Sequence, residues 1–312
     1  MAKENHGVIL PSWSDTTTKK TIINFVNRVN TENTSDYVPP GERIAVFDND
    51  GTLWSEKPFY FQAFFLIDRL KAMAVDHPQW HDTQPYKAIL EGDKQAISRL
   101  TEKDIIQMLA VTHTGMTVEQ FQLIAGSWLK TAKHPRFNRL FTECVFQPML
   151  ELLDYLRDNG FKTYIVSGGG VEFVRAFAQE VYGIPPEQVI GSSVKTKFAL
   201  RDGKFVLVKV PELGSVDDKE GKPVNINLHI GRKPLLAFGN SDGDLAMLQY
   251  TSTRDKANLM LLLHHDDGER EWAYDRESKI GRLDKAWDEA RQKGWTIVSM
   301  QKDFQRVYPF DP

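Results

Sequence analysis

Residues 44–52 decide the fold, and they read Ile44-Ala45-Val46-Phe47-Asp48-Asn49-Asp50-Gly51-Thr52. Four apolar residues are followed at once by two acids and a glycine. A continuous apolar run of this length is typical of a parallel strand, because both faces of such a strand are buried. We therefore expect a buried parallel strand over 44–47, with Asp48 and Asp50 at its carboxyl end.

Three further apolar runs end in the same way. They are 163–166 before Ser167-Gly168-Gly169-Gly170, 235–238 before Gly239-Asn240-Ser241-Asp242-Gly243-Asp244, and 259–263 before His264-His265-Asp266-Asp267. Helical patterns cover 17–29, the stretch from Pro148 to Gly160, and 171–182. Alternation of strands and helices predicts an α/β fold, in which helices cover both faces of an open, mostly parallel sheet.

Two insertions interrupt this alternation. Residues 57–146 contain helix-like stretches, one of which begins with a capping-box pattern of Thr117 and Gln120, and show no strong strand signal. Residues 195–209 carry Asp202-Gly203 between two strand-like runs, which predicts a hairpin. We predict a three-layer α/β core from residues 1–56 and 147–312, and a helical cap from residues 57–146.

Composition excludes several classes of protein. The 312 residues have a formal net charge of −3 and a single cysteine, Cys144, so broad nucleic-acid binding and an internal disulfide are not expected. The longest apolar runs are far below the roughly 18 residues that span a bilayer, and no signal peptide is evident. We expect a cytoplasmic protein by default, or a periplasmic one if a signal was removed, without a membrane partner. The oligomeric state stays open.

The ends of the expected strands carry a set of groups that suits phosphate chemistry. In open α/β sheets, ligands bind beyond the carboxyl ends of the strands. Clustered acids would repel one another without a hard cation, and Mg²⁺ takes oxygen ligands that it shares with substrate phosphate. Ser167 and the following glycine amides can receive an anion, which Lys222 can neutralise. Together these groups predict phosphoryl transfer.

On these residues the sequence resembles the haloacid dehalogenase superfamily, and within it the Mg²⁺-dependent phosphatases. Asp48-Asn49-Asp50-Gly51-Thr52 is similar to motif I, Ser167-Gly168-Gly169 to motif II, Lys222 to motif III, and residues 239–244 to motif IV. Their order and strand context agree over residues 44–250. The superfamily places a C1 cap between motifs I and II, and the helical insertion resembles that of the phosphoserine-phosphatase-like branch.

The resemblance implies a role for each residue. Asp48 would attack phosphorus and form an aspartyl-phosphate, and Asp50 would protonate the leaving alcohol and then activate water. Mg²⁺ would be held by Asp48, by the backbone carbonyl of Asp50 and by motif IV. Ser167 and Lys222 would face the charge on the phosphoryl oxygens. The substrate, a small phosphorylated metabolite, would also meet Thr52, Glu56, Gly168 and Gly169.

Motif IV departs from the family pattern. The usual motif begins Gly-Asp, but this chain has Asn240 in place of the first acid and keeps the second as Asp244. We expect Asn240 and Asp244 to hold the metal, with Asp242 in reserve.

Two other functions stay open. One is carbon–halogen hydrolysis on the same fold, although dehalogenases of this superfamily lack the second acid that Asp50 provides. The other is a non-catalytic phosphometabolite-binding protein, which the change to Asn240 motivates. The run His264-His265-Asp266-Asp267 is explained by a strand end and a turn, with a metal site as the alternative. The sequence does not identify the substrate.

Overall fold

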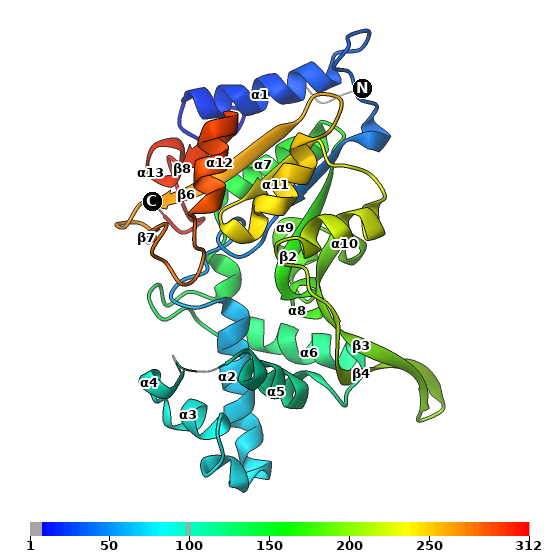
Figure 1. The fold of residues 1–312 in the computed structure, drawn as a ribbon, viewed down its shortest axis with the longest axis vertical. Helices are drawn as coiled ribbons and strands as arrows, with labels where there is room; N and C mark the ends of the chain where they lie inside the picture. Colours follow the sequence, from blue (N-terminus) through cyan, green and yellow to red (C-terminus); the bar gives the residue numbers. More distant parts are fainter. Residues whose placement is uncertain (1–7, 98, 100, 312) are drawn as a thin grey trace.

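The computed structural model describes residues 8–311 except Ser98 and Leu100, so residues 1–7 and 312 of the expected core lie outside the described part. Two lobes follow one another along the longest axis of the molecule (Figure 1). One lobe contains most of the sheet and both the first and the last described residues. The other is made mainly of helices from the first half of the sequence.

The sheet confirms the predicted α/β class. Its order is β4-β3-β2-β1-β5-β6-β7, with β8 also paired to β6. The parallel pairings join β1 (Ile44–Phe47), β2 (Lys162–Gly170), β3 (Val189–Arg201), β5 (Leu236–Gly239), β6 (Leu259–Asp266) and β8 (Thr296–Ser299). The antiparallel additions are β4 (Lys204–Ser215) and β7 (Ala273–Tyr274). The four strands that the apolar runs predict are β2, β1, β5 and β6, which lie side by side.

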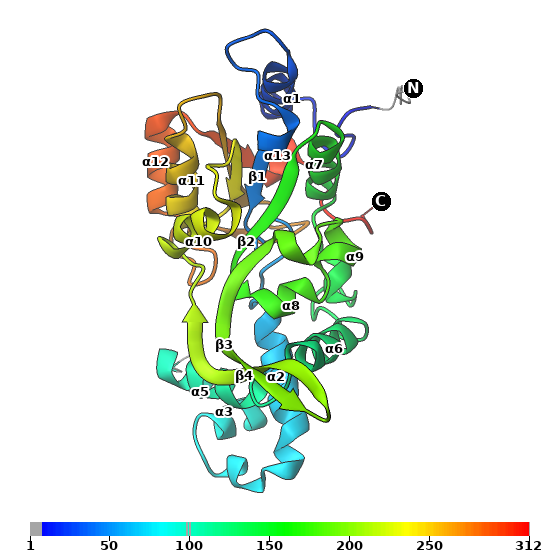
Figure 2. The same ribbon diagram turned by 90° about the vertical axis from the view of Figure 1, so that its right-hand side faces the viewer.

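Side chains of β1 alternate between two apolar layers. Ile44 and Val46 belong to a core shared with α10 (Gly221–Ile230), α11 (Leu245–Ser252) and α12 (Lys285–Lys293). Ala45 and Phe47 belong to the opposite core, shared with α1 (Thr17–Asn30), α7 (Gln147–Asp158), α8 (Val171–Arg175), α9 (Ala178–Tyr182) and α13 (Met300–Asp303). Figure 2 shows α10, α11 and α12 on one side of the sheet and α7 and α9 on the other. Because both faces are covered, a fully apolar β1 is stable.

The helices of the core follow the prediction with one exception. The patterns over 17–29 and after Pro148 are confirmed as α1 and α7. The pattern over 171–182 is wrong as a single helix, because α8 ends at Arg175 and α9 begins at Ala178. At this break Phe177 stacks on Trp54, with ring centroids 4.4 Å apart. Tertiary packing of two aromatic rings thus overrides local helix propensity.

The second lobe is mostly helical, and residues 57–146 supply its helices. Its α-helices are α2 (Phe61–Met73), α3 (Tyr86–Glu91), α4 (Lys94–Ile97), α5 (Glu102–His113) and α6 (Val118–Leu129). Short 3₁₀ turns add η2 (Ala74–Asp76), η3 (Pro78–His81) and η4 (Phe141–Glu143), while η1 (Pro40–Glu42), η5 (Pro186–Gln188) and η6 (Asp242–Asp244) belong to the other lobe. The capping box is confirmed, since Thr117 Oγ1 accepts from the Gln120 amide at 3.1 Å and Gln120 Oε1 accepts from the Thr117 amide at 2.9 Å.

The hairpin of β3 and β4 extends from the sheet to the helical lobe. It is longer than residues 195–209, because β3 begins as a parallel partner of β2. Gly115 donates its amide to the carbonyl of Lys209 at 2.9 Å, and Lys209 donates to the carbonyl of Met116 at 2.9 Å. Arg201 adds a bond to the Gly115 carbonyl at 3.0 Å. The helical lobe therefore includes a strand from the second half of the chain.

Within the described part of the chain, no helix combines the length and the apolar character that crossing a membrane requires.

Candidate active site

The carboxyl ends of the central strands meet at Lys222, in the first turn of α10. Its ammonium donates to Asp48 Oδ1 at 2.6 Å, to Asp244 Oδ1 at 2.7 Å and to the Val166 carbonyl at 2.7 Å. Lys222 is only 2% exposed. These contacts place the residues expected for motifs I, III and IV in one buried cluster.

The cluster holds more acid than base. Asp48, Asp50 and Asp244 surround a single ammonium. Burial and the neighbouring Asp244 raise the pKa of Asp48 well above its usual range, although Lys222 opposes the shift. Burial alone would lower the pKa of Lys222, but Asp244 and Asp48 outweigh burial and raise it. A site with this charge balance favours an additional cation.

Asp50 is held by the turn that follows β1. The Trp54 indole donates to Asp50 Oδ1 at 2.8 Å. Gly51 has a φ of +77°, and a Cβ there would lie 2.2 Å from Asn240 Nδ2, so the turn requires glycine. Burial raises the pKa of Asp50 to about 6, against the opposing effects of Trp54 and Lys222. The carboxyl can therefore hold and release a proton near neutral pH.

Motif II lies directly opposite Asp50. Ser167 is fully buried, and its Oγ accepts from the Gly169 amide at 3.0 Å. A Cβ built on Gly169 would lie 3.2 Å from Ser167 Oγ, 3.4 Å from Gln62 Oε1 and 3.6 Å from Asp50 Oδ2. Three polar groups from three elements thus converge on this glycine. Gly168 is exposed beside them.

Gln62 is a site residue that sequence reasoning missed. It belongs to α2 of the helical lobe, and its Oε1 accepts from the Gly170 amide at 2.8 Å. Its Nε2 lies 3.4 Å from His113 Nε2, at the end of α5. No motif spacing marks a single glutamine in a helical insertion, so only the packing of the two lobes identifies it.

Motif IV divides its tasks between Asn240 and Asp244. Asp244 Oδ2 accepts from the amides of Asn240 at 2.9 Å and Ser241 at 3.0 Å, while Oδ1 accepts from Lys222. Both carboxylate oxygens of Asp244 thus accept hydrogen bonds from the protein. These bonds hold the motif IV loop and Lys222 in place. The Asn240 side-chain oxygen accepts one bond, from Thr52 Oγ1 at 3.1 Å, and an amide oxygen has a second lone pair that can complete a cation site.

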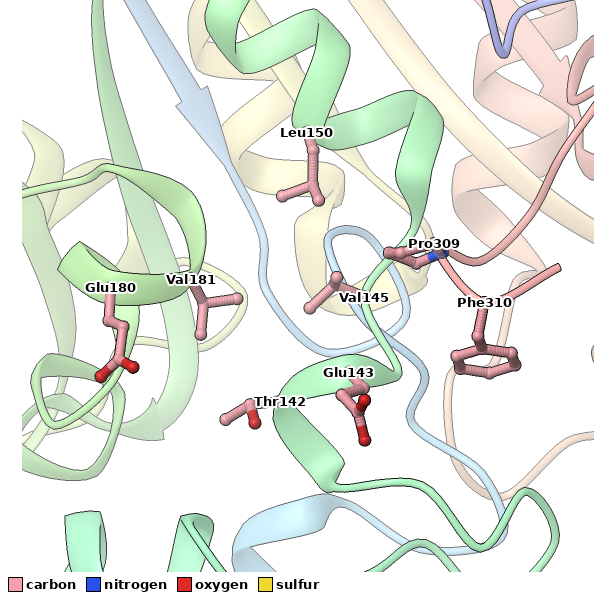
Figure 3. Close-up of a pocket in the computed structure, with 8 residues that line it drawn as sticks. All are labelled: Thr142, Glu143, Val145, Leu150, Glu180, Val181, Pro309 and Phe310. Atoms are coloured by element: carbon pink, nitrogen blue, oxygen red, sulfur yellow. The ribbon is translucent and has the colours of Figure 1, made fainter.

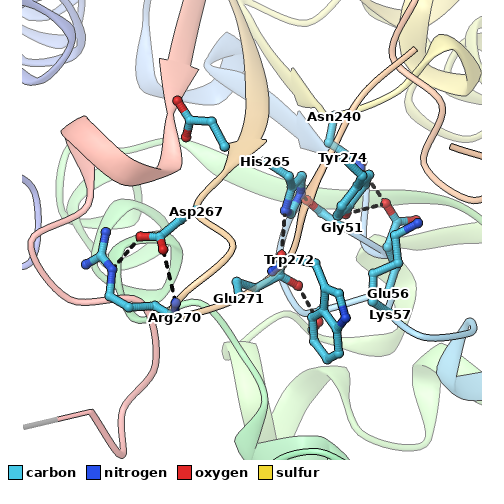
Figure 4. Close-up of polar contacts among 12 residues, drawn as sticks. Gly51, Glu56, Lys57, Asn240, His265, Asp267, Arg270, Glu271, Trp272 and Tyr274 are labelled. Atoms are coloured by element: carbon cyan, nitrogen blue, oxygen red, sulfur yellow. Dashed lines mark hydrogen bonds and ion pairs between the residues drawn. The ribbon is translucent and has the colours of Figure 1, made fainter. Parts of the chain in front are cut away.

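Thr52 and Glu56, expected to meet substrate, are both buried against Asn240. Thr52 Oγ1 donates to Asn240 Oδ1 at 3.1 Å, and Asn240 Nδ2 donates to Glu56 Oε1 at 2.8 Å. The Tyr274 hydroxyl also donates to Glu56 Oε1, at 2.7 Å (Figure 4). Burial raises the pKa of Glu56 well above its usual range, which the Tyr274 bond opposes. This geometry gives Glu56 a task in orienting the Asn240 amide; its contact with substrate stays a prediction.

Asp242, the reserve ligand, has another task. Its Oδ1 accepts from the amides of Asp284 at 3.0 Å and Ala286 at 2.9 Å, at the start of α12. A carboxylate that accepts from the first amides of a helix stabilises the helix N-terminus. Asp242 thus fixes α12 against motif IV.

The donor set fits Mg²⁺ chemically. In the described part of the chain, no three or more His, Cys, Asp or Glu side chains are grouped as a metal site, and this includes the run His264–Asp267. The expected set is Asp48, the Asp50 backbone carbonyl, Asn240 and Asp244. Because both Asp244 oxygens accept from protein donors, the oxygens that remain for a metal are those of the Asp48 carboxylate, the Asp50 carbonyl and the Asn240 amide. All three are oxygen donors beside an excess of buried acid, which is the chemistry that Mg²⁺ prefers.

Changing Asn240→Asp tests the contact with Glu56. The variant places two carboxyl groups where the structure has an amide donor and an acceptor 2.8 Å apart. We expect the single variant to lose about 1–3 kcal/mol of unfolding free energy. The double variant Glu56→Gln/Asn240→Asp restores one donor and one acceptor, so it should regain stability and bind Mg²⁺ more tightly than the native protein.

Urea unfolding and Mg²⁺ titration calorimetry measure the two effects separately. Equal stability of the single and double variants would show that the contact with Glu56 is unimportant. Weaker Mg²⁺ binding by the double variant would place Asn240 outside the metal site.

Asp217, in the loop before α10, makes stability depend on pH. Its Oδ1 accepts from Asn225 Nδ2 at 2.9 Å, whereas its buried Oδ2 has no hydrogen-bond partner. Burial raises the pKa of Asp217 from 3.8 to about 6. The folded state therefore binds this proton more tightly, and the resulting stability is present below pH 4 and lost as pH rises through about 6.

Asp217→Asn removes the ionisable carboxyl group while the side chain keeps nearly the same shape. We expect the variant to be more stable than the native protein by about 2–3 kcal/mol at pH 7.5, with a smaller difference at pH 4.5. Urea unfolding of both proteins at the two pH values gives the comparison. A difference that does not change with pH would contradict the assignment.

A cavity of about 420 Å³ lies elsewhere, between α7, α9 and the C-terminal residues (Figure 3). Leu150 comes from α7, Glu180 and Val181 from α9, and Pro309 and Phe310 from the end of the chain. Neither Asp48 nor Asp50 lines it.

Sequence comparison agrees with this geometry. Residues 45–249, more than half of the chain, match the family described as haloacid dehalogenase-like hydrolase. The chain belongs to this family. No curated protein matches it. The match to this hydrolase family ends before β6, so His265, Glu271 and Tyr274, which lie around motif I in Figure 4, come from beyond the matched residues.

One solved structure shows the same fold, and two further solved structures are similar at lower scores. A conserved protein of unknown function from Anaerococcus prevotii DSM 20548 is similar at a TM-score of 0.54 and 18% identity, over 90% of this chain and 91% of that one. A phosphoserine phosphohydrolase-like protein from Francisella tularensis has a TM-score of 0.38 at 18% identity, over 81% and 99% of the two chains. A substrate-bound phosphoserine phosphatase has a TM-score of 0.36 at 15% identity, over 71% and 86%.

Proposed function

We propose that this haloacid dehalogenase-like hydrolase is a Mg²⁺-dependent phosphatase of small phosphomonoesters. The observation that supports it best is Asp50, a second acid beside the nucleophile with a pKa raised to about 6. An alkoxide leaving group needs a proton as it departs, whereas a halide leaves as a stable anion. The proton donor is therefore useful for phosphate esters and superfluous for carbon–halogen bonds.

The chemistry proceeds in two displacements. In the first, an Asp48 oxygen attacks phosphorus, the bond from phosphorus to the leaving oxygen breaks, and Asp50 gives that oxygen its proton. In the second, Asp50 as carboxylate takes a proton from water, whose oxygen attacks phosphorus and breaks the bond to Asp48. Inorganic phosphate is released, and both carboxyl groups return to their starting state.

Charge stabilisation comes from groups that are already in place. Lys222 is fixed by three hydrogen bonds, and Ser167 Oγ and Asp50 Oδ2 both lie beside Gly169, which follows Gly168 in motif II. Asp48, the Asp50 carbonyl and Asn240 would hold Mg²⁺, which when bound neutralises charge on the carboxylates and phosphoryl oxygens. Preorganised groups of this kind supply much of the catalysis in phosphoryl transfer.

The helical lobe, with residues 57–146 as its main part, acts as the cap in this proposal. It brings Gln62 within hydrogen-bond distance of motif II, on the side where the leaving group must emerge. A cap in this position excludes water and limits the size of the leaving group. Small phosphorylated metabolites are therefore the expected substrates.

Hydrolysis of p-nitrophenyl phosphate, with Mg²⁺ and with EDTA, tests the proposal. We expect phosphate release that depends on Mg²⁺, and no chloride release from 2-chloropropionate. Chloride release independent of metal would favour the dehalogenase. Binding of inorganic phosphate by calorimetry without any turnover would favour a non-catalytic phosphometabolite-binding protein. A screen of phosphorylated metabolites with Mg²⁺ then ranks natural substrates.

A further inference from the structure

A buried histidine–glutamate pair contacts the motif I turn from outside the matched part of the chain. His265 lies near the end of β6, and Glu271 follows in the loop before β7. They are 2% and 0% exposed. Figure 4 shows both side chains directed toward the turn that carries Asp50.

The pair contacts the turn at two points. His265 Nε2 lies 2.7 Å from the Gly51 carbonyl, and Nδ1 lies 3.0 Å from Glu271 Oε2. Glu271 Oε1 accepts from the Ser55 hydroxyl at 2.6 Å. The His265–Glu271 pair thus contacts both residue 51 and residue 55. These two residues flank Trp54, whose indole bonds Asp50.

The donors and acceptors around the pair determine where its hydrogens lie. A backbone carbonyl only accepts, so His265 Nε2 must carry a hydrogen. Glu271 Oε2 faces His265 Nδ1 and also accepts from the Trp272 amide at 2.7 Å. A proton must therefore lie between Nδ1 and Oε2, since two lone pairs would otherwise repel at 3.0 Å. The imidazole is further fixed by stacking on Tyr274, with ring centroids 4.4 Å apart.

The contact to Gly51 acts on Asp50 through the backbone. Gly51 directly follows Asp50, and its amide donates to the Trp54 carbonyl at 2.8 Å. The Gly51 amide belongs to the 50–51 peptide, and the Gly51 carbonyl that His265 contacts belongs to the 51–52 peptide. His265 thus fixes the second of the two peptides that flank Gly51, and with both peptides held the turn keeps the backbone from which the Asp50 carboxyl reaches the Trp54 indole.

We propose that His265, oriented by Glu271, is a positioning residue that keeps the Asp50 carboxyl aimed at the leaving-group oxygen. This inference rests on the proposed phosphatase function. It assigns a catalytic task to the segment beyond residue 249, which the family match does not reach.

Two substitutions separate the two halves of the His265 contact. His265→Gln keeps a donor at the place of Nε2 and can still bind the Gly51 carbonyl. His265→Asn keeps a donor at the place of Nδ1, facing Glu271, but loses Gly51. His264→Asn is the matched control, because the neighbouring residue points to the other face of β6, where it meets Trp287 with ring centroids 4.5 Å apart.

The readout is kcat/KM for two substrates that differ in their need for a proton. An alkyl phosphate needs the general acid, whereas p-nitrophenyl phosphate has a leaving group that departs unprotonated. We expect His265→Asn to lower kcat/KM for the alkyl ester by about 10²-fold, as misplacement of a catalytic group does. The same variant should lower kcat/KM for p-nitrophenyl phosphate by less than about fivefold, because this leaving group does not need the proton. His265→Gln should recover most of the loss, and His264→Asn should change neither substrate.

Thermal unfolding of each variant accompanies the kinetics. Equal losses on both substrates, or losses that follow the unfolding temperature instead of the Gly51 contact, would overturn the positioning role. If His265→Asn does not fold, Glu271→Gln gives the same comparison, with the same selective loss on the alkyl ester expected. A native protein that hydrolyses neither ester with Mg²⁺ would instead contradict the proposed function.

Discussion

Asp48→Asn should abolish turnover, with a loss of about 10⁴-fold or more, as removal of a nucleophile does. An amide is a very poor nucleophile toward phosphorus, and the substitution also removes one negative charge from the expected metal site. The fold should persist, because the Asn side chain keeps an oxygen at the place of Oδ1, where Lys222 donates at 2.6 Å. Steady-state hydrolysis of p-nitrophenyl phosphate measures the effect.

Trapping of the covalent intermediate gives an independent check. Acid quenching with ³²P-labelled substrate should leave label on the native protein and none on Asp48→Asn. Label on the variant, or turnover near the native level, would show that another residue attacks phosphorus. Lys222→Met is a useful comparison, since it keeps the nucleophile and removes the ammonium that Asp48 and Asp244 share.

The central sheet and the strand ends could be predicted because their signals are local. A buried parallel strand leaves a continuous apolar run, and the polar residues that follow it reach one edge of the sheet for purely geometric reasons. Asp48, Ser167 and Asp244 are predicted in this way. In the structure Lys222 bonds Asp48, Asp244 and the carbonyl of Val166, the residue before Ser167. The choice of Lys222 needed the motif order as well.

Residues that act through tertiary packing left no such signal. Gln62 reaches motif II only because α2 of the helical lobe packs at the end of β2. His265 and Glu271 meet Gly51 and Ser55 only because β6 lies two strands from β1. The run of two histidines and two acids is explained from the sequence by a strand end and a turn, with a metal site as the alternative. The structure gives His265 a carbonyl partner and a carboxylate partner, which the sequence does not predict.

The change from acid to amide in motif IV shows a third reason why part of the site could not be predicted from the sequence. From the sequence, Asn240 is expected to hold the metal in place of the usual acid. The structure adds the reason why an amide fits there, since its Nδ2 faces the buried Glu56 and its Oδ1 faces Thr52. An acid at this position would repel Glu56. The two positions must therefore be considered as a pair, which a motif compared position by position does not show.

Asp50→Asn should lower kcat by about 10²–10⁴-fold, the usual contribution of general acid–base catalysis. The second displacement loses its base on every substrate, whereas the first loses its donor only where the leaving group needs a proton. With p-nitrophenyl phosphate, the variant should therefore still form the aspartyl-phosphate and accumulate it. Acid quenching after mixing should show more label on Asp50→Asn than on the native protein.

The comparison with an alkyl phosphate completes this test. There the missing proton donor should block the first displacement, so the same variant should carry little label. Burial raises the pKa of Asp50 to about 6, so the native carboxyl still has a protonated fraction to give near neutral pH, and that fraction falls as pH rises. Native kcat/KM for the alkyl ester should accordingly decline more steeply above pH 6 than kcat/KM for p-nitrophenyl phosphate. The assignment would be contradicted if kcat/KM for the two esters declined with pH in parallel, while Asp50→Asn lost less than about tenfold in kcat and accumulated no labelled aspartyl-phosphate. The proton transfer would then belong to another group.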